Sequence, residues 1–342
     1  MGYLDQEMIE MNRPISILLL SLCLTSCYKP YVKDYDWSGV YIAYQYDLRS
    51  LVVGEGMSFD FGAVLGGVIE NGSDRKVSFV VDDDLVTGRL DAYGGTTAFE
   101  GLQNSPSQSY VATALEKAGI TRVLPLPHNM YTLSNNSGMT IKKGRHTATV
   151  TFKADSLAML SDPALGANPY YAFAWKITSA DADTVLLPKS FQIIAIRLEN
   201  MFFGCWYHGG ESWQVDDATG NEIPGTRTSY PTTIPSSGGT SAVYTLSTAD
   251  ALSCRTDWLH NAAGSLTISL DGDGIAVSGP SVTDLGSSWN KSKLLQDRKI
   301  YLNYRYAGTG GRSTVVRDTL SFRNRERDGV NEWQDSNKEH YK

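Results

Sequence analysis

The chain has 342 residues, 37 acidic against 30 basic side chains and a formal net charge of −7 at pH 7. This acidic balance argues against a nucleic-acid partner and against a polybasic membrane patch. The length is large for one hydrophobic core and comfortable for two domains, and the many Gly, Tyr and Trp residues with few long helical patterns predict an all-β protein.

The N-terminal part resembles an export signal. An apolar run at residues 15–24 follows Arg13 and leads through Thr25 and Ser26 to Cys27. This order of charge, apolar run, small residues and Cys is typical of a bacterial signal that ends in a lipid-accepting cysteine. The run is too short to span a bilayer. We therefore expect cleavage before Cys27, acylation of Cys27 and a membrane partner reached through this lipid anchor.

The residues on either side of the apolar run complete this interpretation. Residues 1–10 contain three acids where export signals carry positive charge, so we interpret 1–26 as the signal, with its first ten residues a start-site artefact. Residues 27–36 are short and polar and contain Pro30, which predicts a lipidated tether. Cleavage leaves 316 residues with a formal charge of −5.

Short strands separated by turn signals fill the first half of the mature chain. The clearest is residues 145–153, where His146, Ala148, Val150 and Phe152 alternate with polar residues, as in a half-buried antiparallel strand. Further strands are predicted at residues 40–46, 57–65, 76–82, 170–177 and 190–198. Without full-length helices between them, these strands predict a β-sandwich over residues 37–199.

A fresh apolar strand at residues 201–207 opens the second domain, which we place at residues 200–335, with residues 336–342 as a tail. Two hairpins are predicted there, one of residues 266–270 with 275–277 and one of residues 299–306 with 313–322. Sequential hairpins can close on themselves and remove edges, so we expect a small antiparallel β-barrel, with a second sandwich as the alternative.

Two cysteines remain in the mature chain besides the acylated one. Cys205 and Cys254 would lie in a compartment where disulfides persist, so they could pair. The alternative is two buried thiols.

Catalytic and metal motifs are absent from the sequence, including a nucleophile elbow, a Walker loop, His-Glu-x-x-His and Cys-x-x-Cys. The five His residues are scattered, whereas zinc ligands cluster at short spacing. The acidic turns at residues 82–84 and 271–274 could hold calcium, but turn chemistry explains both. We expect a non-enzymatic protein without cofactor or metal; the alternative is a glycoside hydrolase, which needs two carboxylates across a sugar.

Aromatic side chains are the candidate ligand-binding residues. Sugar rings stack on exposed Trp and Tyr, and neighbouring polar groups bind their hydroxyls. Tyr207, Trp213, Trp258 and Trp289 lie in or beside irregular Gly/Ser-rich segments of the second half. Trp213 and Trp289 lie among polar residues and are the more available, although large aromatics are mostly buried.

Several motifs also resemble those of a known family. They are the lipobox before Cys27 and residues 131–133, 140–144, 204–210, 318–325 and 328–333. These segments are similar to a family of two-domain envelope lipoproteins of Bacteroides-type bacteria, whose function is uncharacterised. The resemblance implies an immunoglobulin-like N-terminal sandwich, a lipocalin-like C-terminal barrel and a setting beside surface carbohydrate-binding systems. It carries over no catalytic residue.

These expectations combine into one functional hypothesis. We expect an acylated envelope protein that binds an extracellular polysaccharide beside an outer-membrane uptake or adhesion partner. Its location would be the outer membrane, with the cell surface favoured over the periplasmic face, although Tyr28-Lys29-Pro30 follow Cys27 where surface-displayed members often have acids. The alternative from another class is a structural component, such as an adhesin-like subunit or a transporter accessory.

Overall fold

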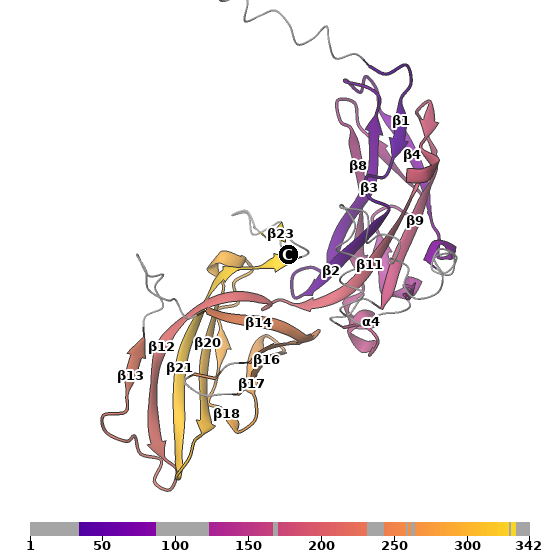
Figure 1. Cartoon of the computed structure of the whole chain (residues 1–342). Coiled ribbons are helices and arrows are strands. Elements are labelled where there is room, and N and C mark those ends of the chain that lie inside the picture. The colour runs from indigo at the N-terminus through magenta and orange to yellow at the C-terminus, as the bar shows by residue number, and fades with distance from the viewer. Residues whose placement is uncertain are drawn as a thin grey trace, which may run out of the picture.

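The computed structural model describes residues 34–86, 123–166, 170–230, 243–257, 259–260, 264–327 and 330–332. The described part is all-β and forms two sheet-built bodies in chain order (Figure 1). The signal, Cys27 and the tail at residues 336–342 lie outside it. No helix within the described ranges is long and apolar enough to cross a bilayer.

The first body consists of two sheets. The five-stranded sheet has the order β10-β1-β3-β8-β6, with bounds β1 Gly39–Tyr41, β3 Ser58–Gly66, β6 Tyr131–Leu133, β8 Thr147–Ala154 and β10 Thr184–Val185. The six-stranded sheet has the order β2-β11-β9-β4-β7, and β5 also pairs with β9. Its bounds are β2 Tyr46–Val53, β4 Arg75–Val81, β5 Leu124–Pro125, β7 Gly138–Ile141, β9 Tyr171–Ala180 and β11 Phe191–Asn200.

One aromatic core joins these two sheets. Phe61 of β3 contacts Phe173 and Trp175 of β9, with ring centroids 5.1 and 4.9 Å apart. Phe152 of β8 contacts Phe173 at 5.4 Å. Because strand side chains alternate between faces, the strands of each sheet direct one apolar row into this shared core.

The short helices lie in the connections between strands. They are η2 His128–Met130, α4 Ser156–Ser161, η3 Leu187–Lys189 and η4 Leu295–Asp297. α4 begins after Asp155, whose carboxylate accepts a hydrogen bond from the amide of Ala158 at 3.0 Å and so caps the helix.

The second body is a ten-stranded sheet with the order β17-β16-β15-β14-β12-β21-β20-β18, with β13 on β12 and β19 on β20. The bounds are β12 Gly204–Asp216, β13 Thr228–Tyr230, β14 Val243–Asp250, β15 Ser253–Thr256, β16 Leu266–Asp271, β17 Gly274–Ser278, β18 Val282–Asp284, β19 Ser288–Trp289, β20 Lys299–Ala307 and β21 Arg312–Asn324. A two-stranded ribbon, β22 Glu326–Arg327 and β23 Val330–Asn331, follows it.

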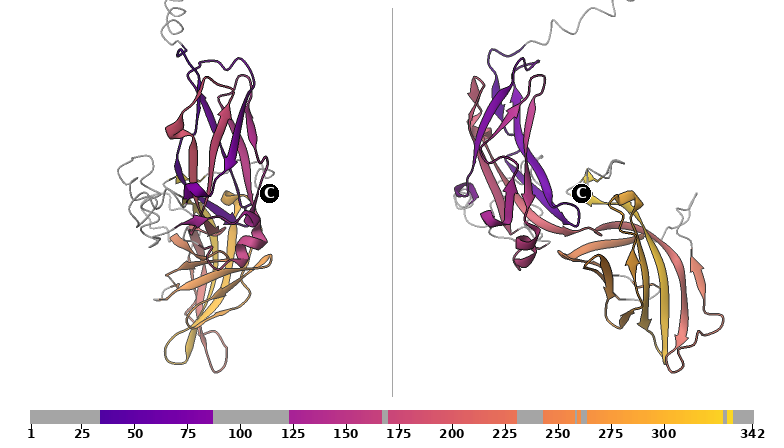
Figure 2. Two further views of the ribbon diagram at one scale, coloured as in Figure 1. Left: turned by 90° about the vertical axis from the view of Figure 1, so that its right-hand side faces the viewer. Right: turned by 180° about the vertical axis from the view of Figure 1, so that it is seen from behind.

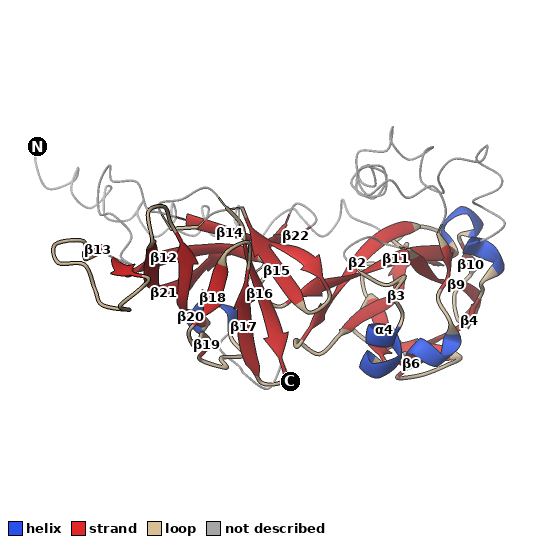
Figure 3. Cartoon of the chain, turned by 90° about the horizontal axis from the view of Figure 1, so that it is seen from below, coloured by secondary structure: helices blue, strands red, loops and turns tan. Residues whose placement is uncertain are grey.

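This sheet curls into a nearly closed barrel (Figure 3). At the seam, the amide of Val277 in β17 donates to Asp284 of β18 at 3.0 Å. The indole N–H of Trp289 in β19 donates to the carbonyl of Asp273 at 3.0 Å. These hydrogen bonds join the β16–β17 hairpin to β18 and β19, between which the described residues form no ladder.

The two bodies meet at the turn that connects β2 of one sheet of the sandwich to β3 of the other. Glu55 in this turn accepts hydrogen bonds from Arg298 at 2.7 Å and from Arg325 at 2.8 Å, and the side chains of both arginines are at most 2% exposed. Arg325 also pairs with Glu332. Val52 packs into the barrel core, so the junction has an apolar and an ionic part. Figure 2 shows the described chain beginning at the far end of the sandwich from the barrel.

Candidate functional site

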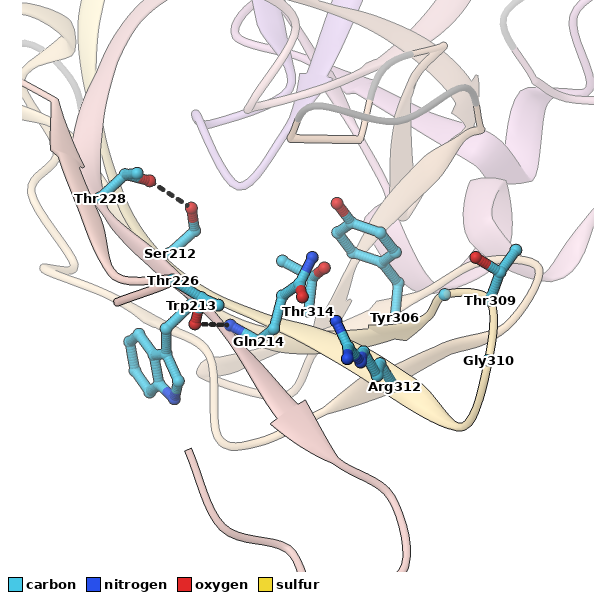
Figure 4. Close-up of a pocket in the computed structure, with 11 residues that line it drawn as sticks. Ser212, Trp213, Gln214, Thr226, Thr228, Tyr306, Thr309, Gly310, Arg312 and Thr314 are labelled. Atoms are coloured by element: carbon cyan, nitrogen blue, oxygen red, sulfur yellow. Dashed lines mark hydrogen bonds between the residues drawn. The ribbon is translucent and has the colours of Figure 1, made fainter. Parts of the chain in front are cut away.

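A cavity of about 600 Å³ lies beside the β20–β21 turn, at the end of the barrel that Figure 1 shows away from the sandwich, and Figure 4 shows the residues that line it. Its lining is rich in hydroxyl groups and also carries one amide and one guanidinium group. The lining residues are Ser212, Trp213, Gln214, Thr226, Thr228, Tyr306, Gly308, Thr309, Gly310, Arg312 and Thr314.

Strand alternation puts the polar side chains on the inner side of the barrel. Ser212 and Gln214 are two residues apart on β12, and Thr314 opposes Gln214 and Tyr306 in the ladders of β21. The hydroxyl groups of Ser212 and Thr228 lie 3.1 Å apart and join β13 to this wall. The cavity is therefore lined by four neighbouring elements, β13, β12, β21 and β20.

Glycines form part of the rim. The β20–β21 hairpin turns through Gly310 and Gly311, whose φ values of 68° and 70° fall in the left-handed region that favours glycine. A Cβ atom built at either position meets no atom within 4 Å. The positive φ values let the hairpin turn tightly at the edge of the cavity.

A buried polar cluster lies on the same inner surface, deeper in the barrel. Asp318 has a fully buried side chain, and its Oδ2 lies 3.4 Å from His208 Nδ1. The hydroxyl of Tyr244 donates to the same oxygen at 3.4 Å, and its ring lies 4.4 Å from that of His208. An inward-facing carboxylate therefore has an imidazole and a phenol as neighbours.

Tyr306 connects this cluster to the cavity. Its ring lines the cavity, and its hydroxyl donates to the carbonyl of His260. The imidazole of His260 stacks on Tyr230, with ring centroids 4.4 Å apart. Burial lowers the pKa of His260, against a smaller opposite effect of Asp318, so this ring is neutral near pH 7. Burial, with the nearby Asp318 charge, raises the pKa of Tyr230.

Trp213 does not have the exposure expected of a sugar-stacking residue. The residue is 8% exposed and packs with Val215 and Val315. The guanidinium of Arg227 lies 3.9 Å from its ring centroid and that of Arg317 lies 5.1 Å away. Figure 4 shows its indole on the opposite side of β12 from Ser212 and Thr228. The two arginines, which are distant in sequence, therefore cover the indole of Trp213.

The other predicted aromatics do not gather around the cavity. Trp289 is half-buried at the barrel seam, with its ring centroid 5.4 Å from that of Phe202. Tyr207 lies half-buried on the outer side of β12, beneath the guanidinium of Arg323 at 5.7 Å. Trp258 lies outside the described residues.

Cys205 and Cys254 are both free in the structure, so the disulfide that the sequence allows is not formed. Cys254 is fully buried in the barrel core. Cys205 is half-exposed, with its Sγ 3.8 Å from the hydroxyl of the exposed Thr245. The two thiols therefore project to opposite faces of the barrel wall.

The acidic turns take part in ordinary contacts. Asp82 forms an ion pair with Lys176 at 2.6 Å, and Asp271 pairs with Gly274 in the β16–β17 hairpin. A search of the described residues finds no group of three or more His, Cys, Asp or Glu side chains placed to hold a metal ion.

Sequence reasoning missed the polar residues of the cavity. Part of the signal was present, because the alternation over residues 299–306 places Tyr304 and Tyr306 on the inner face. Ser212, Gln214 and Thr314 carry no such signal, because neutral polar residues are common in exposed strands and loops alike. Their convergence depends on which strands become neighbours.

Comparisons with known proteins agree with this architecture. A family model described as an N-terminal domain matches residues 33–184. A solved structure of a Bacteroides ovatus protein of unknown function is 18% identical, with a TM-score of 0.52, covering 85% of this chain and 95% of that one. A search of curated proteins finds no significant match.

Two further solved structures are more distant. One, from a second Bacteroides ovatus protein of unknown function, is 10% identical with a TM-score of 0.38, covering 87% of this chain and 100% of that one. The other, a two-domain protein with unknown function from Bacteroides fragilis, is 13% identical with a TM-score of 0.32, covering 83% and 88%. The family match and the first structure together support a relationship to an uncharacterised family of Bacteroides proteins.

Proposed function

We propose that this protein is a non-catalytic envelope lipoprotein that binds an extracellular glycan in the open end of its C-terminal barrel. The cavity carries the proposal, because hydroxyl and amide side chains converge there from four neighbouring strands. In this proposal the first domain is immunoglobulin-like and the second lipocalin-like, and the barrel mouth is where ligands of such barrels enter.

The chemistry of the cavity suits a sugar. A sugar ring presents many hydroxyl groups that both donate and accept hydrogen bonds, and Ser, Thr and Gln side chains do the same. The ring of Tyr306 adds an apolar surface for sugar C–H groups. The volume of about 600 Å³ lies in the range of small-molecule sites, so a terminal part of a glycan chain fits better than a long internal stretch.

The remaining parts of the proposal concern location and partners. Acylation of Cys27 would anchor the protein to the outer membrane, preferably at the cell surface. The described chain begins at one end of the molecule and the cavity lies toward the other, which suits a glycan receptor beside an uptake or adhesion partner (Figures 1 and 2).

A soluble form that starts at Tyr28 tests the binding function. We expect retention on at least one polysaccharide in affinity gels, and binding about tenfold weaker for Gln214→Ala combined with Thr314→Val, which removes polar atoms from the cavity. Tyr301→Ala is the control, because Tyr301 is 41% exposed on the outer side of β20. Absence of retention on every polysaccharide, or equal loss in the control, contradicts the proposal.

Metabolic labelling with palmitate tests the anchor separately. The wild-type protein should take up label and fractionate with the outer membrane, and Cys27→Ala should do neither. A labelled Cys27→Ala protein would show that the lipid is attached elsewhere.

A further inference from the structure

Arg312 gives the cavity its charge. Of the described residues that line the cavity, it alone has a charged side chain; the others are neutral and mostly polar. It opens β21 and lies beside Gln214 and Thr314 in Figure 4. The chain therefore presents one guanidinium to a ligand that is otherwise contacted by hydroxyl and amide groups.

This guanidinium differs from most other arginines in the barrel. Within the described part of the chain, Arg312 forms no ion pair with a carboxylate. By contrast, Arg227 pairs with Glu211 at 2.8 Å and Glu222 at 2.6 Å, and Arg298 pairs with Glu55. An arginine without a carboxylate partner keeps its five donors available to a ligand.

The acids nearest to Arg312 across the barrel wall are Asp216, which opposes it in the β12–β21 ladder, and the adjacent Asp217. Asp216 Oδ1 accepts hydrogen bonds from the Ala218 amide at 3.1 Å, the Thr219 amide at 2.8 Å and the Thr219 hydroxyl at 2.9 Å. These bonds, those of Thr219 first, lower the pKa of Asp216, and the charge of Arg312 makes a smaller contribution. Asp217 Oδ1 accepts the hydroxyl of Ser313 at 2.6 Å. Both carboxylates are therefore held in place by groups other than Arg312.

We propose that the ligand of this cavity is an anionic glycan, whose carboxylate or sulfate group binds Arg312 while its hydroxyl groups bind the Ser, Thr and Gln side chains. This inference rests on the proposed glycan-binding function and names the substrate class. The planar guanidinium matches carboxylate and sulfate oxygens with two parallel hydrogen bonds, and such charge-assisted bonds are stronger than neutral ones.

The test compares matched neutral and anionic polymers. Polygalacturonate is set against its fully methyl-esterified form, and dextran sulfate against dextran, in affinity gels at fixed ionic strength. The first pair reports recognition of a carboxylate and the second that of a sulfate. We expect the anionic member of at least one pair to bind about tenfold or more tightly than the neutral member.

Variants then locate the charge that causes the preference. Arg312→Gln should remove the preference, and Arg312→Lys should keep part of it as a point charge without the fork geometry. Arg305→Gln is the matched control, because Arg305 lies on β20 with its side chain outside the cavity and the same charge is lost. Arg305→Gln should leave the preference unchanged.

The outcomes separate the two proposals. Equal binding of neutral and anionic polymers, or equal losses in Arg312→Gln and Arg305→Gln, contradicts the role of Arg312 and leaves glycan binding intact. Wild-type protein that binds only neutral glycans would also contradict the role of Arg312 and leave glycan binding intact. Wild-type protein that binds no glycan overturns both. Equal melting temperatures of the variants and the wild type would exclude misfolding as the cause of a loss. Arg312 is exposed, so its substitution should preserve the fold.

Discussion

Single aromatic residues show how much burial depends on the neighbouring strand. Trp213 lies among polar residues in the sequence, and those residues suggested exposure. In the structure one of them, Glu211, pairs with Arg227 directly before β13, and the guanidinium of Arg227 covers the indole. The sequence shows which residues alternate along a strand, but the cover comes from a residue 14 positions away that only the pairing of β12 and β13 brings near.

Truncation of Trp213 should therefore affect stability more than binding. We expect Trp213→Ala to lower the free energy of unfolding by about 3 kcal/mol in urea titrations, because it leaves a cavity between Val215, Val315 and the two arginines. Trp213→Phe should lose less. Glycan affinity of the folded protein should change by less than about threefold, because the indole lies on the opposite side of β12 from Ser212. Lost affinity with unchanged stability would instead make Trp213 a binding residue.

The two thiols should also be distinguishable in solution. Burial raises the pKa of the Cys254 thiol, whereas Cys205 is half-exposed, so iodoacetamide should modify Cys205 first in the native protein that starts at Tyr28. Alkylation after denaturation without reductant should modify both residues. Mass spectrometry that finds a linked Cys205–Cys254 peptide would show that the protein forms the bridge after all.

At the scale of elements, local patterns predicted strands well. The alternation at residues 145–153 corresponds to β8, the β16–β17 hairpin turns at Asp271–Gly274, and residues 299–306 and 313–322 correspond to β20 and β21. The patterns could not predict the order of the strands in the sheet. In the structure β12 pairs with β13, β14 and β21. These ladders join residues far apart in the chain, and the cavity exists only because of them.

The pairing of β12 with β21 depends on a glycine. Gly210 opposes Asp318, and a Cβ atom at Gly210 would lie 1.9 Å from the carbonyl oxygen of Arg317. The two strands approach so closely here that no side chain fits between them.

Substitution of this glycine should separate the strands. We expect Gly210→Ala to lower the free energy of unfolding by about 2–3 kcal/mol, since the backbone must shift to admit the methyl group. Gly220→Ala is the control, because its Cβ would meet no atom within 4 Å and only its φ of 72° is unfavourable. A smaller loss for Gly210→Ala than for Gly220→Ala, both measured by urea denaturation, would refute the close approach.

For the whole molecule, length and strand pattern suggested two domains but not how firmly they are joined. Glu55 lies in the turn between β2 and β3 of the sandwich, while Arg298 and Arg325 belong to the barrel half of the chain. Arg298 also donates to the carbonyl of Met201 in the connection between β11 and β12. Nothing in the local sequence around Glu55 marks it as a junction residue, because its partners are more than 240 positions away.

Neutralising Glu55 should uncouple the domains. Glu55→Gln leaves two buried guanidinium groups without their carboxylate. Breaking a buried ion pair in this way lowers the free energy of unfolding by about 3–5 kcal/mol. We expect calorimetry to show two separated unfolding transitions in Glu55→Gln where the wild type shows one. Glu222→Gln, which removes an exposed partner of Arg227, should keep the wild-type profile. A single unchanged transition in Glu55→Gln would exclude coupling through this cluster.

Acid should have the same effect on the wild type. Burial alone would raise the pKa of Glu55, but Arg325 and Arg298 outweigh it and lower the pKa below its usual 4.5. The stabilisation is therefore complete above pH 4.5 and is lost as the pH falls through the lowered value. The stability difference between wild type and Glu55→Gln should shrink over that acidic range in urea titrations. A constant difference would argue against ionised Glu55.

The placement of the Gly310–Gly311 turn has a mechanical consequence for an anchored protein. This turn lies at the end of the barrel away from the sandwich. The tether would leave from the end of the sandwich away from the barrel (Figure 2). If Cys27 is acylated as proposed, the sandwich, joined rigidly to the barrel at Glu55, would act as a spacer whose length contributes to the distance between the lipid surface and the cavity opening. The ends of glycan chains would then bind at that distance from the bilayer. A shorter first domain would reduce this distance without changing the cavity.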